Sequence, residues 1–347
     1  MVDKAANEGG THLCSVVAQE RGEDPIGTAP VYNEYLMIQI PSPWQKEVTD
    51  SKTMAPSIAE ALAAHGDNRP GIRVQGILPE NPDEVGETLR IIHYRRPEGD
   101  VFADFERDEY EVPVSEAGRL VTALLGGPED LAAFASYRQQ VDKHVRDLFI
   151  CTHGSRDAAC GRFGYPIFAA LREQYVPASA GSLRVWRVSH LGGHRFAPTI
   201  LDLPSGRYWA FMKVELLDTL IDQRGPVARL REHYRGWGAL EHPMAQAAER
   251  EVFMQMGWDW LQGRKRLRLR TYDEAAEQGV VELYYEAADG ASPQAWVATV
   301  EVAGTVRTLQ NSGSDDWFDA KQYRVTRLDP MDPAEFGTSA GNGEVEA

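Results

Sequence analysis

The order of predicted secondary structure is the strongest constraint on the fold of this chain. Two stretches show the same order: strand, helix, strand, strand, strand, helix. The first runs from an apolar β-type segment at 35–40, which Pro41-Ser42-Pro43 ends, to a helix predicted over 116–125. The second runs from an apolar strand at 147–150 to a helix over 215–223. This order is typical of a thioredoxin-like α/β fold, and its repetition indicates a duplicated unit.

Alternation of apolar and polar residues, together with turn residues, places the elements between these ends. The predicted elements are a helix at 58–65, strands at 72–77, 89–94 and 101–112, a linking helical stretch at 128–146, a helix at 164–175, and strands at 183–188, 199–203 and 208–214. A third region begins with a helix over 244–260, whose apolar residues form one stripe. Alternating segments at 266–270, 280–285, 296–302 and 323–327 then predict a small antiparallel sheet packed on that helix.

Composition excludes several classes of protein. The formal net charge of −16 argues against nucleic-acid binding, which needs concentrated Lys and Arg. Three cysteines are too few for a disulfide scaffold and fit a reducing compartment, where a thiol pair is more often a ligand or a catalyst. No stretch approaches the ~20 apolar residues of a membrane span, and residues 1–10 lack the features of a signal peptide. We therefore expect a cytoplasmic protein without a membrane span.

Two short motifs bring metal-binding side chains to the ends of predicted strands. Cys151 and Cys160, with eight residues between them, lie in a loop after the strand at 147–150. The second motif, His190-Leu191-Gly192-Gly193-His194, follows the strand at 183–188. Glycines let main-chain N–H groups approach a metal–sulfur group, and the spacing of the histidines lets both bind one metal ion. Either motif alone is weak evidence, but the pair within one predicted domain indicates a metal site.

Other interpretations of these residues stay open at this point. Two cysteines and two histidines are also a zinc set, although structural zinc sites usually space their cysteines about two to four residues apart. A thioredoxin-like disulfide or peroxide reductase would use Cys151 and Cys160, although such dithiols normally form Cys-x-x-Cys. His153 is either a hydrogen-bonding neighbour of the centre or an ordinary loop residue. Cys14, far away in sequence, is interpreted as a packing residue or an incidental one.

The sequence resembles the sucrase/ferredoxin-like family over about residues 14–236. Members are thioredoxin-like [2Fe–2S] proteins, and the resemblance implies a [2Fe–2S] cluster whose ligands are Cys151, Cys160, His190 and His194. Thioredoxin-like ferredoxins have four cysteine ligands in the same order, so histidines replace the last two here. The matching segments are Cys14-Ser15, Asp24-Pro25-Ile26-Gly27-Thr28-Ala29, Pro41-Ser42-Pro43-Trp44, Phe149-Ile150-Cys151-Thr152-His153-Gly154, Asp157-Ala158-Ala159-Cys160 and His190-x3-His194-Arg195-Phe196-Ala197-Pro198-Thr199.

The implied ligand set predicts electron transfer at intermediate potential. Two ferric ions, two sulfides and two thiolates sum to zero charge, whereas four thiolates would give −2, so the neutral site accepts an electron more easily. Rieske centres with this ligand set span about −150 to +300 mV, against about −400 mV for plant-type ferredoxins. Each imidazole can also lose a proton, so the potential should fall as pH rises. We expect a carrier or redox sensor that meets an unidentified redox partner protein, rather than an enzyme.

The sequence thus predicts four parts. A degenerate thioredoxin-like domain without cofactor (14–127) precedes the thioredoxin-like [2Fe–2S] ferredoxin domain (128–236), and a small α+β domain (237–328) and a disordered tail (329–347) follow. Pro41-Ser42-Pro43-Trp44 stands in the first domain where the second has its cysteine loop, so we expect no ligands there. The arginines around the motifs, which could neutralise the cluster or contact a partner, are Arg156, Arg162 and Arg195.

Overall fold

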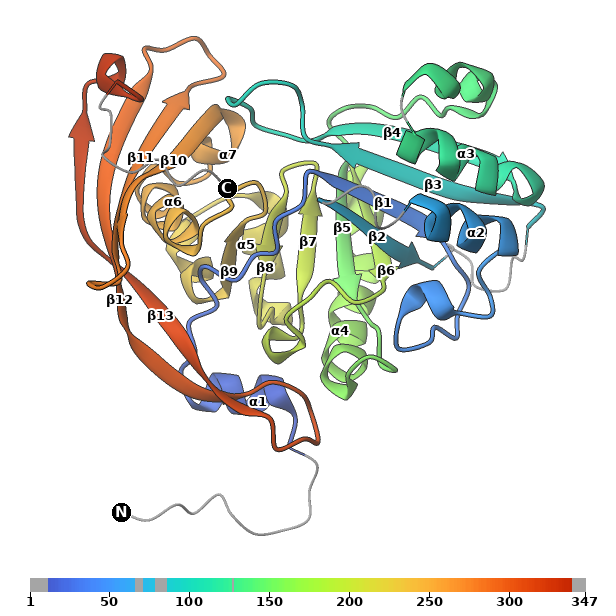
Figure 1. The fold of residues 1–347 in the computed structure, drawn as a ribbon, viewed down its shortest axis with the longest axis horizontal. Helices are drawn as coiled ribbons and strands as arrows, with labels where there is room; N and C mark the ends of the chain where they lie inside the picture. Colours follow the sequence, from blue (N-terminus) through green and yellow to red (C-terminus); the bar gives the residue numbers. More distant parts are fainter. Residues whose placement is uncertain (1–11, 66–70, 79–85, 127, 339–347) are drawn as a thin grey trace.

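Two β-sheets and the helices packed on them make up the described residues, 12–65, 71–78, 86–126 and 128–338 of this computed structural model (Figure 1). The larger sheet contains β1 (Glu34–Gln39), β2 (Ile72–Ile77), β3 (Thr88–Arg95), β4 (Glu106–Pro113), β5 (Arg146–Cys151), β6 (Leu183–Val188), β7 (Ile200–Leu203), β8 (Arg207–Trp209) and β9 (Tyr234–Trp237). The smaller sheet contains β10 (Arg264–Asp273), β11 (Gln278–Glu286), β12 (Gln294–Leu309) and β13 (Trp317–Met331). The α-helices are α1 (Cys14–Glu20), α2 (Pro56–His65), α3 (Val114–Gly126), α4 (Ala158–Ala170), α5 (Leu217–Asp222), α6 (Pro243–Met256) and α7 (Asp259–Gln262).

The larger sheet repeats one strand topology. Its order is β4-β3-β1-β2-β6-β5-β7-β8-β9, so β1–β4 form one set of strands and β5–β8 form a second set beside it. Counted in chain order, the first strand of each set is parallel to the second and antiparallel to the third, and the third is antiparallel to the fourth. A helix joins the parallel strands in both sets, α2 in the first and α4 in the second. The predicted thioredoxin-like α/β fold class is confirmed.

The two sets of strands form a continuous sheet rather than separate bodies. Strands β2 and β6 are antiparallel neighbours through the pair Ile77 and Val188. The carboxylate of Asp147 in β5 is fully buried, and its hydrogen-bond donors come from both sets of strands. Those donors are Tyr94 at 2.5 Å, Arg107 at 2.9 Å, Arg184 at 2.8 Å and Trp186 at 2.7 Å. A buried charge is tolerated only when it is paired and hydrogen-bonded, so this network ties the two sets together.

The N-terminal segment belongs in space to the second set of strands, although the predicted first domain begins at residue 14. Helix α1 packs on the segment 194–196 and on β12, and the amide of Gly27 donates to the carbonyl of Arg235 at 3.0 Å. These contacts join residues that are far apart in the chain, so local patterns could not place them. Figure 1 shows α1 beside the tips of β12 and β13.

Several predicted elements differ from the observed ones in their bounds. Helix α4 begins at Ala158 rather than 164, because Asp157 accepts a hydrogen bond from the amide of Ala159 and caps the helix. The helical stretch predicted over 128–146 is a 3-10 helix that ends at Tyr137. The predicted helix over 244–260 breaks at Gly257, whose φ of 70° places it in the left-handed region.

The smaller sheet packs on α6, as predicted, but its last hairpin is much longer than expected. Strand β12 runs to Leu309 and β13 runs through Met331, so residues 329–331 of the expected tail are paired with 295–297. The hairpin runs along one side of the molecule in Figure 1, and its tip at residues 310–316 hydrogen-bonds to Cys14 of α1 and to Asp157. Residues 339–347 of the expected tail lie outside the described ranges. Among the described residues, no helix is both long enough and apolar enough to cross a membrane.

A matched pair of glycines in α3 tests the close packing of α2 on α3. A Cβ on Gly118 would lie 2.4 Å from the carbonyl oxygen of Ser57 in α2, whereas a Cβ on Gly126 would meet nothing closer than 4.0 Å. We expect Gly118→Ala to lower the free energy of unfolding by about 1–3 kcal/mol, because backbone must move. Gly126→Ala should leave it unchanged or raise it by up to ~1 kcal/mol. Denaturant unfolding followed by circular dichroism measures both, and equal effects would contradict the packing.

Candidate metal centre

The two predicted cysteine ligands lie at the junction of β5 and α4. Cys151 is the last residue of β5 and Cys160 lies in the first turns of α4, and both are buried. The helix packs directly on the end of the strand, because a Cβ on Gly164 would come within 2.0 Å of the carbonyl oxygen of Cys151. Cys160 is therefore held by a helix, not by the loop expected from the sequence.

The two thiols interact with each other and with one of the predicted histidines. Their mutual hydrogen bond lowers the pKa of Cys151 well below its ordinary value and raises the pKa of Cys160. Burial opposes the shift at Cys151, and the nearby ring of His190 adds to it. The donor atoms of these three side chains all lie within 4.8 Å of one another. They could hold a metal ion through two thiolates and one imidazole nitrogen.

The fourth predicted ligand, His194, lies beside this group rather than within it. A ring nitrogen of His194 lies within 4.8 Å of the ligand atoms of Cys14 and Asp157. The ring centroid of His194 is 5.1 Å from that of His190. The two histidines are joined by a tight turn in which Gly193 has a φ of 71°, a conformation that favours glycine. The structure therefore brings the four predicted residues to one place and adds two further side chains to it.

The histidine rings present nitrogen atoms without partners. The Nδ1 atoms of His190 and His194 are buried and have no hydrogen-bond partner among the described residues. Nε2 of His194 lies 2.7 Å from the carbonyl oxygen of Gln310, which fixes the proton on Nε2 and leaves a lone pair on Nδ1. Burial also lowers the pKa of His194, so its imidazole is neutral at pH 7. Two unpartnered imidazole nitrogens beside a thiol pair fit a group with soft metal ions.

His153 has both ring nitrogens occupied and is not a ligand in this arrangement. Its Nε2 donates to the carbonyl of Gln45 at 2.7 Å, and its Nδ1 accepts from the amide of His190 at 3.1 Å. Its ring also packs edge-on against Trp44. His153 thus connects the cysteine loop, the histidine loop and the first set of strands. Of the two roles that the sequence left open, the structure supports that of a hydrogen-bonding neighbour of the site.

Arg235 is a positioning residue that the sequence did not reveal. Its guanidinium is buried and donates to the carbonyl of Gly192 at 3.0 Å and to the side chain and carbonyl of Thr28 at 3.1 and 2.5 Å. Burial lowers the pKa of Arg235 to about 10. The guanidinium lies so close to the histidine turn that a Cβ on Gly193 would be 2.7 Å from it. No local sequence pattern distinguishes this arginine of β9 from the others, so its positioning role is identified only by its tertiary contacts.

Cys14 packs in a small buried apolar cluster, as interpreted from the sequence, and its thiol also borders the site. Burial raises the pKa of its thiol to about 11, and the thiol lies 3.7 Å from Oδ1 of Asp157. Ser312 at the hairpin tip donates to Asp157 through its amide at 2.9 Å and its hydroxyl at 2.7 Å. Nε2 of His194 lies 3.9 Å from the same carboxylate. Asp157, Cys14 and Ser312 therefore form a polar layer that covers His194.

Each of the three arginines that the sequence singled out contacts another side chain of this chain. Arg156 pairs with Glu47, and Arg195 pairs with Glu23 at 2.8 Å. The guanidinium of Arg162 lies 5.8 Å from the ring centroid of Phe163. These contacts show how the side chains are held, and they assign no ligand role to any of the three.

The fold and the site together define a thioredoxin-like α/β protein with Cys and His groups that could bind a metal. The sucrase/ferredoxin-like family matches residues 25–236, more than half of the chain, and the chain belongs to that family. It is also similar to the "Altered inheritance of mitochondria protein 32" of Saccharomyces cerevisiae strains S288c, YJM789 and JAY291, with 26% identity over 201 residues. That match covers 50% of this chain and spans 63% of the length of these relatives. No solved structure matches the chain.

Two serines in the hairpin tip test the polar layer over His194. Ser312 bonds to Asp157, whereas the hydrogen bonds of Ser314 lie within its own turn, where its hydroxyl donates to the carbonyl of Asn311 and accepts from the amide of Asp316. Ser312→Ala should speed amide hydrogen exchange at residues 310–316 by about tenfold, because a charge-assisted hydrogen bond contributes ~1.5 kcal/mol. Ser314→Ala should change it little. Equal exchange in the two variants would show that the hairpin tip is held in another way.

Proposed function

We propose that this chain binds one [2Fe–2S] cluster through Cys151, Cys160, His190 and His194 and exchanges single electrons with a partner protein. The observation that carries the proposal is the pairing of two buried, hydrogen-bonded thiols with two imidazoles whose buried Nδ1 atoms have no partner among the described residues. A bound cluster supplies reversible one-electron oxidation and reduction. Family membership supports the same conclusion.

The protein groups around these four residues would set how the site handles charge. Two thiolates bring two negative charges, while the imidazoles are neutral ligands. The carbonyl of Gln310 and the carboxylate of Asp157 hold a proton at Nε2 of His194. Loss of that proton at high pH would add negative charge to the site. Reduction should therefore become less favourable as pH rises.

Exposure points to where a partner protein would approach. Cys151, Cys160 and His194 are buried, whereas His190 is only half-buried. Electrons would therefore enter and leave beside His190. The partner itself and a cytoplasmic location are parts of the proposal, supported by the acidic, cysteine-poor composition.

A dithiol reductase is the second candidate function, favoured by the lowered pKa of Cys151 beside a second thiol. Both cysteines are buried, however, with 1% and 0% of their surfaces exposed. A disulfide or peroxide substrate would need to reach the sulfur of Cys151 directly. The reductase therefore requires an opening of the site that electron transfer does not.

The first test is the metal content of protein purified without oxygen. We expect a red-brown protein with about two irons and two sulfides per chain, because the four ligands complete one cluster. On reduction, its EPR signal should have a lower average g value than that of an all-cysteine cluster. A colourless protein with stoichiometric zinc, or one with a Cys151–Cys160 disulfide and no iron, would refute the proposal.

Histidine-to-cysteine variants test the ligand assignment. His194→Cys and His190→Cys should each keep a cluster but lower its potential, because a thiolate adds negative charge, and should weaken its dependence on pH. Redox titrations across about pH 6–10 measure both effects. Cys14→Ser is the control, since it removes the third buried cysteine while leaving the four ligands, and should retain the cluster absorbance. A parent potential that is independent of pH and unchanged in both histidine variants would exclude these ligands.

A further inference from the structure

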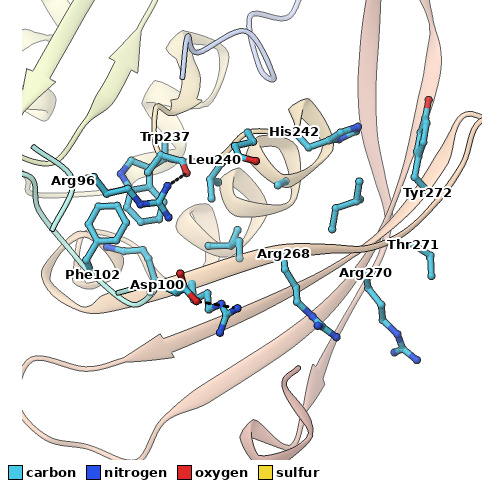
Figure 2. A pocket seen from close by; sticks show the side chains of 17 residues that line it. Arg96, Asp100, Phe102, Trp237, Leu240, His242, Arg268, Arg270, Thr271 and Tyr272 are labelled. Carbon is cyan, nitrogen blue, oxygen red and sulfur yellow. Dashed lines mark hydrogen bonds and ion pairs between the residues drawn. The ribbon is translucent and has the colours of Figure 1, made fainter. Parts of the chain in front are cut away.

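A cavity of about 480 Å³ lies away from the metal centre, between the two sheets, and is lined by none of the four proposed ligands. One wall is β10, the edge strand of the smaller sheet. The opposite wall is the segment after β9 and the start of α6, including Leu240, His242 and Ala245. Figure 2 shows these two walls facing one another, with Phe102 and Trp237 at one end and Tyr272 at the other.

The wall formed by β10 is the main chain of the strand rather than one face of its side chains. Every residue from 265 to 272 lines the cavity. Side chains of a strand alternate between the two faces of a sheet, so consecutive residues can line one cavity only through the strand edge. Figure 2 agrees, because the side chains of Arg268 and Arg270 point away from the cavity.

The main-chain groups along the free edge of β10 can pair with another strand, and among the described residues they do so at the beginning of the strand. The amide of Lys265 donates to the carbonyl of Phe102 at 2.9 Å, and the carbonyl of Lys265 accepts from the amide of Phe102 at 3.3 Å. Because main-chain groups alternate between the two sides of a strand, those of Leu267 and Leu269 face the same way, away from β11. None of the described residues hydrogen-bonds to these groups in the cavity.

Two arginines, Arg96 and Arg266, carry the accessible positive charge of the cavity. Its lining also contains the acids Asp100 and Glu241, the fully buried Lys265, and Arg268 and Arg270, which point away from the cavity and pair with the buried Glu282. Arg96 donates to the carbonyl of Ala239 at 3.3 Å and has no carboxylate partner among the described residues. Arg266 pairs with Asp100 at 3.1 Å, but both side chains are largely exposed, so a ligand carboxylate could replace Asp100.

We propose that this groove binds an extended, acidic peptide segment of a partner protein as an added strand beside β10. The free main-chain groups of Leu267 and Leu269 would bond to its backbone, and Arg96 and Arg266 would meet its carboxylates. The inference stands independently of the cluster.

The test selects peptides from a random 12-residue display library on the full chain as purified. We expect the enriched peptides to be rich in Asp and Glu and to bind less tightly as salt increases. Binding should slow amide exchange at Leu267 and Leu269 and leave the absorbance of the purified protein unchanged. Enrichment of neutral or helical peptides, or no protection at these two amides, would overturn the proposal. Self-association that competes for the groove would overturn the choice of occupant.

Peptide chemistry tests the added strand without changing the protein. N-methylation of alternate residues of a selected peptide removes the N–H groups that point to one side. Methylation in one register should weaken binding at least about tenfold, because it removes hydrogen bonds to β10, while methylation in the other register should have little effect. Equal effects in both registers would exclude strand addition.

Two protein variants, each with a matched control, complete the test. Leu267→Pro removes an N–H that faces the groove and leaves the pairing with β11 intact, so peptide affinity should fall about tenfold, while Leu267→Ala should retain it. Arg96→Gln should weaken binding several-fold, and Arg119→Gln on distant α3 should not. If Leu267→Pro fails to fold, Arg96→Gln and the methylated peptides decide the question. Unchanged binding in Arg96→Gln would overturn the role of charge.

Discussion

A single buried carboxylate, Asp157, holds the candidate metal centre together. It caps α4 and so fixes Cys160, it accepts two hydrogen bonds from Ser312, and it lies beside the thiol of Cys14 and the ring of His194. Burial alone would raise the pKa of Asp157, but the hydrogen bonds from Ser312 and Ala159 lower it below its ordinary value. The carboxylate therefore stays charged at neutral pH. Four segments that are distant in sequence converge on this one charge, so the shape of the site depends on it.

The sequence predicted the parts of the molecule that local patterns determine. Strand 72–77 and strand 183–188 have their predicted bounds, and the repeated order of elements corresponds to the repeated strand topology. Of the residues in the two motifs, Cys151, Cys160 and His190 lie in one group, and His194 lies in a neighbouring group. Asp157, Ser312 and Arg235 were not foreseen, because each acts through contacts between segments remote in sequence. A cap, a hairpin tip and a buried arginine carry no signal of their role until the chain is folded.

The first set of strands supports the loops of the second. Its loop Pro41-Ser42-Pro43-Trp44, which follows β1 as the cysteine loop follows β5, contacts that cysteine loop directly. The carbonyl of Trp44 accepts from Ser155 at 2.6 Å, and the neighbouring carbonyl of Gln45 fixes His153, which in turn accepts from the amide of His190. The first set of strands therefore fixes the cysteine and histidine loops of the second set.

Exposure distinguishes the two functions proposed for the thiol pair. The 480 Å³ cavity beside β10 and a second one between α2 and α3 are lined by none of the four proposed ligands. A reaction that transfers atoms needs a pocket where its substrate contacts the reacting group. Electron transfer needs only close approach to the edge of a buried centre, and the half-buried ring of His190 provides such an edge. Two buried cysteines beside one half-buried imidazole therefore suit the proposed one-electron exchange better than direct contact between a thiol and a substrate.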